Sequence, residues 1–105
     1  MAETKDLTLE TTGVSSVIEL DIDDPQVLII MKALASETRL NILRILKKKL
    51  DVCQTAKALN QTEANVSAQI KILEKAHLIS PKYEAGRHGV KKICGVSVDR
   101  IIINI

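Results

Sequence analysis

Aromatic side chains are almost absent from this sequence, which contains Tyr83 but no tryptophan and no phenylalanine. Modules that bind single-stranded RNA or DNA stack the bases on aromatic side chains, so the composition argues against such a platform. The hydrophobic core must therefore be built from aliphatic residues. At 105 residues the chain is about the usual length for one domain with one core.

Long hydrophobic runs and cysteine motifs are also missing. No apolar stretch approaches the roughly 18 residues needed to cross a bilayer, and residues 1–6 lack the basic and then apolar order of a signal peptide. Cys53 and Cys94 form neither a CxxC pair nor a disulfide framework, which fits a reducing compartment. We therefore expect a cytoplasmic protein with no membrane partner, no metal and no other cofactor.

Catalytic constellations are missing as well. The sequence offers no nucleophile with a base and an oxyanion site, no phosphate-binding glycine loop and no paired carboxylates on one face. His77 and His88 have no accompanying set of metal ligands. Cys53 and Cys94 fit either of two roles, small core residues or a redox pair, of which the first is the commoner for cysteine. The sequence predicts a protein that is not an enzyme.

Charges of the two signs are distributed unevenly along the chain. Residues 1–37 carry two basic and eight acidic side chains, a net charge of −6, whereas residues 38–105 carry thirteen basic and five acidic ones, a net charge of +8. This division suggests that the C-terminal two thirds contacts a polyanion. Basic surfaces also occur without a nucleic-acid partner, so charge alone does not decide the function.

Helix signals begin at Asp24 and Pro25, which are typical of an N-cap followed by a proline in the first turn. The apolar spacing that follows predicts a helix to about Ala35. Ser36 is the predicted cap of a second, central helix. Its last turn is predicted to hold the three lysines at 47–49, because cations stabilise the C-terminal end of a helix.

Two further helices are predicted to follow with a tight turn between them. Asp51 and Gln54 have the spacing of a capping box, and the short helix after Asp51 is predicted to end at Asn60, a residue that tolerates the left-handed conformation. Thr62 is the predicted cap of the next helix, which covers residues 63–76. Helices joined this tightly must cross steeply.

A hairpin is predicted after these helices. Residues 78–84 and 90–96 have the composition of strands, and residues 85–89 form a basic turn bracketed by glycines. We divide the chain into a strand-like N-terminal extension, residues 1–23, and a domain at residues 24–105 that ends in a strand. The apolar segments 14–20 and 100–105 are left without partners, and we expect them to pair, within one subunit or across a two-fold axis. The alternative is that both ends of the chain are flexible.

The predicted fold class is mainly α with a small β-sheet (α+β), as a winged helix-turn-helix in which the terminal strands form an extra sheet. In such folds the second helix of the turn enters the DNA major groove and the hairpin touches flanking phosphates. Amides such as Asn65 and Gln69 suit adenine, hydroxyls suit bases or phosphates, and cations suit phosphates. The candidate DNA contacts are Thr62, Glu63, Ala64, Asn65, Ser67, Gln69, Lys71, Arg87, His88, Lys91 and Lys92.

Three segments carry a resemblance to a known family: KALASETRLNILRIL at 32–46, AKAL at 56–59 and NVSAQIKILEKAHLI at 65–79. Over about residues 32–98 the sequence resembles the ArsR-type winged-helix regulators of bacteria and archaea. The segment GRHGVKKIC at 86–94 with VDRI at 98–101 is similar to a largely archaeal branch of these regulators. The resemblance implies a homodimer that binds operator DNA, commonly as a repressor released by a signal.

The sequence departs from that family at three places. Metal-sensing members have two cysteines one residue apart where this chain has DVC at 51–53, so metal sensing is not expected. Ala68 and Gln69 stand where many relatives have arginine and histidine, which removes a cation from the recognition helix. No helix follows the predicted hairpin, so the homodimer is expected to form through the first helix, the terminal strands or both. A winged helix that binds a protein instead of DNA is the alternative function.

Overall fold

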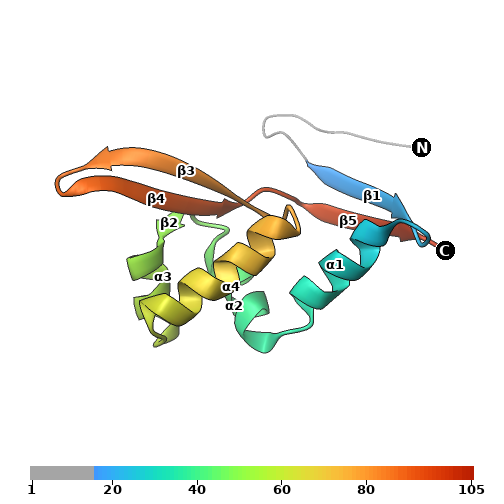
Figure 1. The fold of residues 1–105 in the computed structure, drawn as a ribbon, viewed down its shortest axis with the longest axis horizontal. Coiled ribbons are helices and arrows are strands. Elements are labelled where there is room, and N and C mark those ends of the chain that lie inside the picture. Colours follow the sequence, from blue (N-terminus) through green and yellow to red (C-terminus); the bar gives the residue numbers. More distant parts are fainter. Residues whose placement is uncertain (1–15) are drawn as a thin grey trace.

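The computed structural model describes residues 16–105, which form four helices, a three-stranded sheet and a separate pair of strands (Figure 1). The helices are α1 (Pro25–Leu34), α2 (Glu37–Ile45), α3 (Val52–Leu59) and α4 (Glu63–Lys75). The strands are β1 (Val17–Asp21), β2 (Leu50–Asp51), β3 (Ile79–Gly86), β4 (Gly89–Val96) and β5 (Arg100–Asn104). Strands predicted before residue 16 lie outside the described residues.

Each helix begins at the cap that the sequence predicts. Asp24, Ser36 and Thr62 accept hydrogen bonds from backbone N–H groups of the first turns of α1, α2 and α4, and Asp51 forms the full capping box with Gln54 before α3. These bonds satisfy donors that have no partner inside a helix.

The end of α2 differs from the prediction. This helix stops at Ile45, and residues 47–49 lie beyond it instead of forming its last turn. Leu46, which follows Ile45, is completely buried. We attribute the early end to Leu46, whose burial in the core directs the chain toward β2.

Aliphatic side chains from all four helices and from the sheet form one core. Fully buried members include Ile30 from α1, Ile42 from α2, Val66 and Ile70 from α4, and Cys94 from β4. The predicted inward face of α4 is confirmed, because Val66, Ile70 and Leu73 are its buried residues. The remaining faces of α4 are therefore available to other partners.

The three-stranded sheet has the order β2-β4-β3 and is antiparallel throughout. The β3–β4 hairpin projects past the helices at one end of a molecule that measures 49 × 31 × 21 Å (Figure 1). Its turn is tighter than predicted: Gly86 pairs with Gly89, so only Arg87 and His88 form the tip. Gly89 has φ of +113°, a conformation that L side chains rarely adopt.

The strands near the two ends of the chain pair with each other in a parallel arrangement within one subunit, β1 beside β5. This confirms the expected pairing in its intramolecular form. Ile18 lies opposite Ile101 and Leu20 opposite Ile103, and both Ile18 and Ile101 pack against the core. In the described part of the chain, the segment that follows the hairpin is this strand and not a helix.

Candidate nucleic-acid interface

The turn between α3 and α4 sets the exposed edge of α4. Asn60 ends α3 with φ of 55° and ψ of 46°, the left-handed conformation that the sequence predicts. Thr62 then caps α4 through its hydroxyl, which accepts from the N–H of Asn65. Thr62, Glu63 and Ala64 are exposed, so the start of α4 is presented to solvent.

The amides along α4 form a hydrogen-bonded row. Asn65 Nδ2 donates to Gln61 Oε1 at 2.9 Å, and Gln69 Nε2 donates to Asn65 Oδ1 at 3.3 Å. Gln69 Oε1 in turn accepts from Arg39 Nη1 at 2.7 Å. Both amides are half-buried and already engaged within the protein, so pairing with adenine would replace or share these bonds. Ser67 is half-buried and Lys71 is exposed on the same helix.

Arg39 is the residue of this region that the sequence reasoning missed. Its Nε donates to the carbonyl of Ala33 at 2.7 Å and its Nη2 to the carbonyl of Lys32 at 2.9 Å. Together with the bond to Gln69, the guanidinium joins the end of α1 to the middle of α4. An arginine in the first turn of α2 was the only signal in the sequence.

The cations of the hairpin fall into two groups. Arg87, His88 and Lys91 are exposed, although Lys91 Nζ lies 3.9 Å from the carboxylate of Asp51. Lys92 is half-buried, and its Nζ lies 2.9 Å from Glu74 Oε2 of α4. The hydrogen bond from Lys92 to Glu74 raises the pKa of this lysine above its ordinary value, although partial burial opposes the shift.

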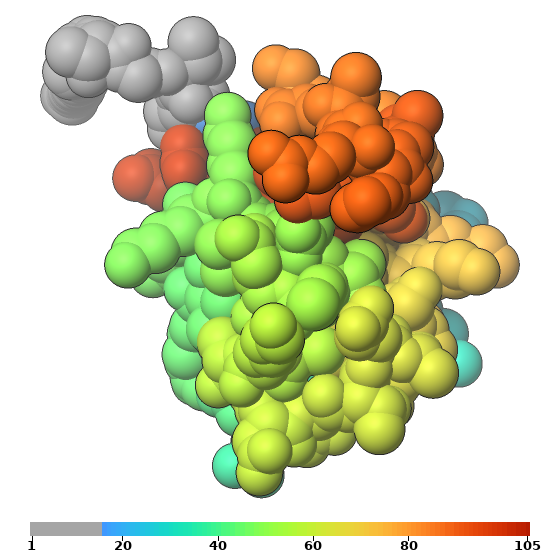
Figure 2. Space-filling model, turned by 90° about the vertical axis from the view of Figure 1, so that its left-hand side faces the viewer, coloured from blue at the N-terminus to red at the C-terminus, as the bar shows by residue number. Residues whose placement is uncertain are grey.

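The ion pair therefore ties the hairpin to α4. In Figure 2 the tip of the hairpin (orange) lies above α3 (green) and the start of α4 (yellow-green) on one face of the molecule. The start of α4 and the hairpin thus lie on one face of the molecule. The structure places Lys92 against Glu74, and a role of Lys92 at phosphates stays a prediction.

The two cysteines lie near the junction of α3 with the sheet. Leu50, which lies three residues before Cys53, pairs with Cys94 of β4. Both cysteines are free thiols; Cys53 is half-buried and Cys94 is fully buried. Burial raises the pKa of the Cys94 thiol, which keeps it protonated and unreactive.

Residues 16–105 show neither a cluster of metal ligands nor a membrane-spanning helix. No group of three or more histidine, cysteine, aspartate or glutamate side chains could hold a metal ion in this part of the chain. None of the helices described is long and apolar enough to cross a membrane.

Comparison with known proteins agrees with this geometry. Residues 36–80, which contain α2, α3 and α4, match the family model described as "Bacterial regulatory protein, arsR family". These residues are therefore similar to the helix-turn-helix domain of that family. No curated protein sequence matches the chain.

Solved structures with a similar fold cover more of the chain than this family model does. One is the homodimeric winged helix-turn-helix DNA-binding domain Mb0332 of Mycobacterium bovis, a possible ArsR-family regulator, with 26% identity and a TM-score of 0.62 over 69% of this chain. The match spans 64% of that protein, slightly less than two thirds of its length. HlyU of Vibrio cholerae has 25% identity and a TM-score of 0.60 over 69% of this chain and 75% of its own.

NolR of Sinorhizobium fredii has 23% identity and a TM-score of 0.63 over 70% of this chain and 71% of its own, and it supports the fold alone. The fold class of this chain, a winged helix-turn-helix with additional terminal strands, is as predicted. The family model describes a regulatory protein, and the Mycobacterium bovis structure is a DNA-binding domain.

Proposed function

We propose that this chain is a transcription regulator that binds double-stranded DNA in a sequence-specific manner, with α4 in the major groove and the β3–β4 hairpin on flanking phosphates. The observation that carries the proposal is the common face in Figure 2, which presents both the exposed start of α4 and the hairpin, whose tip is formed by Arg87 and His88. A helix held with its first turns outward can enter a groove about 12 Å wide. The exposed hairpin cations can then reach the backbone beside it.

The residues on this face divide into base readers and phosphate contacts. Asn65 and Ser67 are the first candidates for reading bases, because Gln69 is held by Arg39. Thr62, Glu63 and Ala64 lie on the leading edge of α4, where side chains reach base edges in this type of fold. The proposed phosphate contacts are Lys71, Arg87, His88, Lys91 and Lys92, of which Lys92 would have to leave Glu74.

The proposed active form is a homodimer. The outer face of α1 supports it, because Leu28, Ile29 and Met31 are 58%, 44% and 48% exposed, an unusual composition for a helix face in water. The homodimeric relative from Mycobacterium bovis supports it as well. We propose α1 as the main contact, with the β1–β5 pair beside it. Substitution of Met31 by glutamate is expected to give monomers in sedimentation velocity, and an unchanged dimer would exclude α1 as the interface.

Finer features of the proposal follow from the family likeness. We propose repression as the mode of action, the cytoplasm as the location, no enzymatic activity and membership of the largely archaeal branch. The hairpin sequence GRHGVKKIC at 86–94 supports the last of these.

Salt-dependent binding to duplex DNA tests the function. If the three exposed cations Lys71, Arg87 and Lys91 of each subunit each neutralise one phosphate, a dimer neutralises about six. The logarithm of the affinity should then fall with the logarithm of salt concentration with a slope of about −5. The variant Arg87→Ala removes one contact from each subunit, so its slope should be smaller in magnitude by about 2. Arg44→Ala is the matched control, because Arg44 is an exposed arginine on α2, outside the hairpin and the proposed dimer contact.

Weak binding at every salt concentration would refute the proposal and favour the protein-binding alternative. The engagement of Gln69 by Arg39 and the alanine at position 68 are the observations that favour this alternative. Recovery of bound sites from the native host would then separate the two. A regulator dimer predicts a palindrome with half-sites about one helical turn apart, or a multiple of it.

A further inference from the structure

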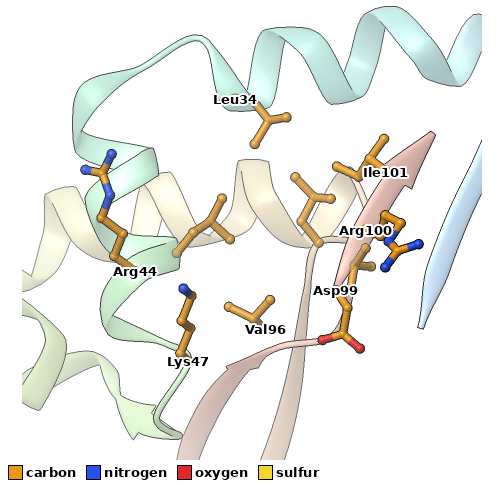
Figure 3. Close-up of a pocket in the computed structure, with 10 residues that line it drawn as sticks. Leu34, Arg44, Lys47, Val96, Asp99, Arg100 and Ile101 are labelled. Carbon is orange, nitrogen blue, oxygen red and sulfur yellow. The ribbon is translucent and has the colours of Figure 1, made fainter. Parts of the chain in front are cut away.

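A cavity lies between the helices and the segment that joins the β3–β4 hairpin to β5 (Figure 3). It is remote from the face that carries the start of α4 and the hairpin tip. Its volume is about 230 Å³ and it is partly open to solvent. The apolar residues that line it are Leu34, Leu43, Leu78, Val96, Val98 and Ile101.

The walls of this cavity leave aliphatic surface exposed. Leu34, Leu43, Val96, Val98 and Ile101 are all half-buried, although each packs against the core. A closed apolar cavity of about 150 Å³ is large enough to bind benzene. The space here is therefore suited to a ring or to a chain of about eight carbons.

The charged groups at the mouth favour a negatively charged ligand. Lys47, Arg44 and Arg100 contribute three cations, against the single carboxylate of Asp99. Figure 3 shows the amine of Lys47 directed toward the apolar side chains, whereas Arg44 and Arg100 point away on either side.

The carboxylate of Asp99 does not neutralise the charge of Lys47. This carboxylate points away from the cavity in Figure 3 and accepts a hydrogen bond from the N–H of Ser16 at 3.1 Å. Within residues 16–105 no carboxylate forms an ion pair with Lys47. Lys47 is the one of the three cations that is directed toward the apolar side chains, and a single cation matches a monoanion better than a ligand of higher charge.

We propose that this cavity is a binding site for a small monocarboxylate with an apolar chain or ring. The carboxylate would lie at Lys47 and the apolar part between Leu43, Val98 and Ile101. The same ligand would touch Leu78, two residues beyond the C-cap of α4, and Leu34, whose neighbour Ala33 accepts a hydrogen bond from Arg39. The proposal does not depend on DNA binding, because the ligand is measured on the chain alone.

Calorimetric titration of the full chain with octanoate tests the site. We expect saturable binding with a Kd below about 1 mM, and binding of neutral 1-octanol that is about fivefold weaker because it lacks the charge at Lys47. Lys47→Gln should weaken octanoate about fivefold and leave 1-octanol unchanged. Lys48→Gln is the matched control, an exposed neighbour that does not line the cavity, and should change neither.

Methyl-resolved NMR spectra locate the ligand. Octanoate should shift the methyl signals of Leu43, Val98 and Ile101 and leave those of Leu28 and Ile29 on the outer face of α1 unchanged. Any one of three results overturns the proposal: no saturable binding, an equal loss in Lys47→Gln and Lys48→Gln, or shifts confined to α1. Equal affinity for octanoate and 1-octanol would also overturn it, because the charge would then play no part.

Discussion

Replacement of Arg39 by alanine should destabilise the protein far more than a surface arginine would. Three hydrogen bonds disappear, and the carbonyl of Ala33, a residue only 1% exposed, is left without this donor. The two half-buried bonds, to Ala33 and Gln69, contribute about 1 kcal/mol each, and the buried carbonyl that is left unsatisfied costs about 1 kcal/mol more. We therefore expect a loss of about 3 kcal/mol in the free energy of unfolding.

Urea unfolding at one fixed protein concentration measures this loss, since a dimer's stability depends on concentration. With a slope of about 1.5 kcal/mol per molar urea, the midpoint should fall by about 2 M. Arg44→Ala is the control, because Arg44 is exposed and bonds only to Asn41 on its own helix; its midpoint should move by less than about 0.3 M.

Arg39→Lys separates the charge of Arg39 from its geometry. Lysine keeps the charge but lacks the planar fork that reaches two carbonyls and an amide at once, so it should recover less than half of the loss. Equal midpoints for Arg39→Ala and Arg44→Ala would refute the role assigned to this guanidinium.

Three further predictions concern backbone conformation, an ion pair and thiol reactivity. His77 has φ of 63°, so His77→Gly should raise the free energy of unfolding by about 0.5–1 kcal/mol in thermal melts; a lower melting temperature would contradict this. The pKa of Lys92 is raised in the folded state by its pair with Glu74. The pair therefore stabilises the fold fully at pH values below the pKa of lysine in the unfolded chain, about 10.4. This stabilisation is lost as the pH rises through the folded-state pKa. Wild type should therefore lose stability more steeply than Glu74→Gln above about pH 10, and parallel profiles would exclude the pair. In thiol titration of native protein Cys53 should react before Cys94, and simultaneous reaction would contradict the burial of Cys94.

Local signals in the sequence were sufficient for the helix starts and for the tight turn. A cap such as Asp51 and a left-handed residue such as Asn60 act on backbone groups within a few residues, so their effect does not depend on the rest of the fold. The same reasoning failed at the end of α2, where the burial of Leu46 is decided by residues far away in the sequence.

The hairpin tip shows how two glycines can have different roles. Both were assigned to the turn, but Gly86 ends β3, where an added Cβ would lie 3.0 Å from the carbonyl oxygen of Gly89. Gly89 has open space around it and is required by its positive φ. From the sequence both glycines are expected in a turn. The sequence does not show that Gly86 lacks room for a side chain whereas Gly89 needs its positive φ.

The sequence allowed us to predict which elements share the candidate surface, but not which side chains bond to one another on it. The order of helices and hairpin placed the start of α4 and Arg87 on one surface. The bonds from Arg39 to Gln69 and from Lys92 to Glu74 join segments separated by 30 and 18 positions, and nothing in their local sequence indicates a partner. They are set by how the elements pack.

The pairing of β1 with β5 has a consequence for the order of folding. Val17 pairs with Arg100, so the two strands meet only after a loop of about 80 residues closes, which costs roughly 3 kcal/mol more entropy than closing a three-residue hairpin. The helices and the hairpin need no such closure. During synthesis β1 leaves the ribosome first yet waits for β5, so its inward side chains Ile18 and Leu20 stay uncovered on that side until the last strand emerges. The terminal pair is therefore expected to dock last in folding and to open first in unfolding.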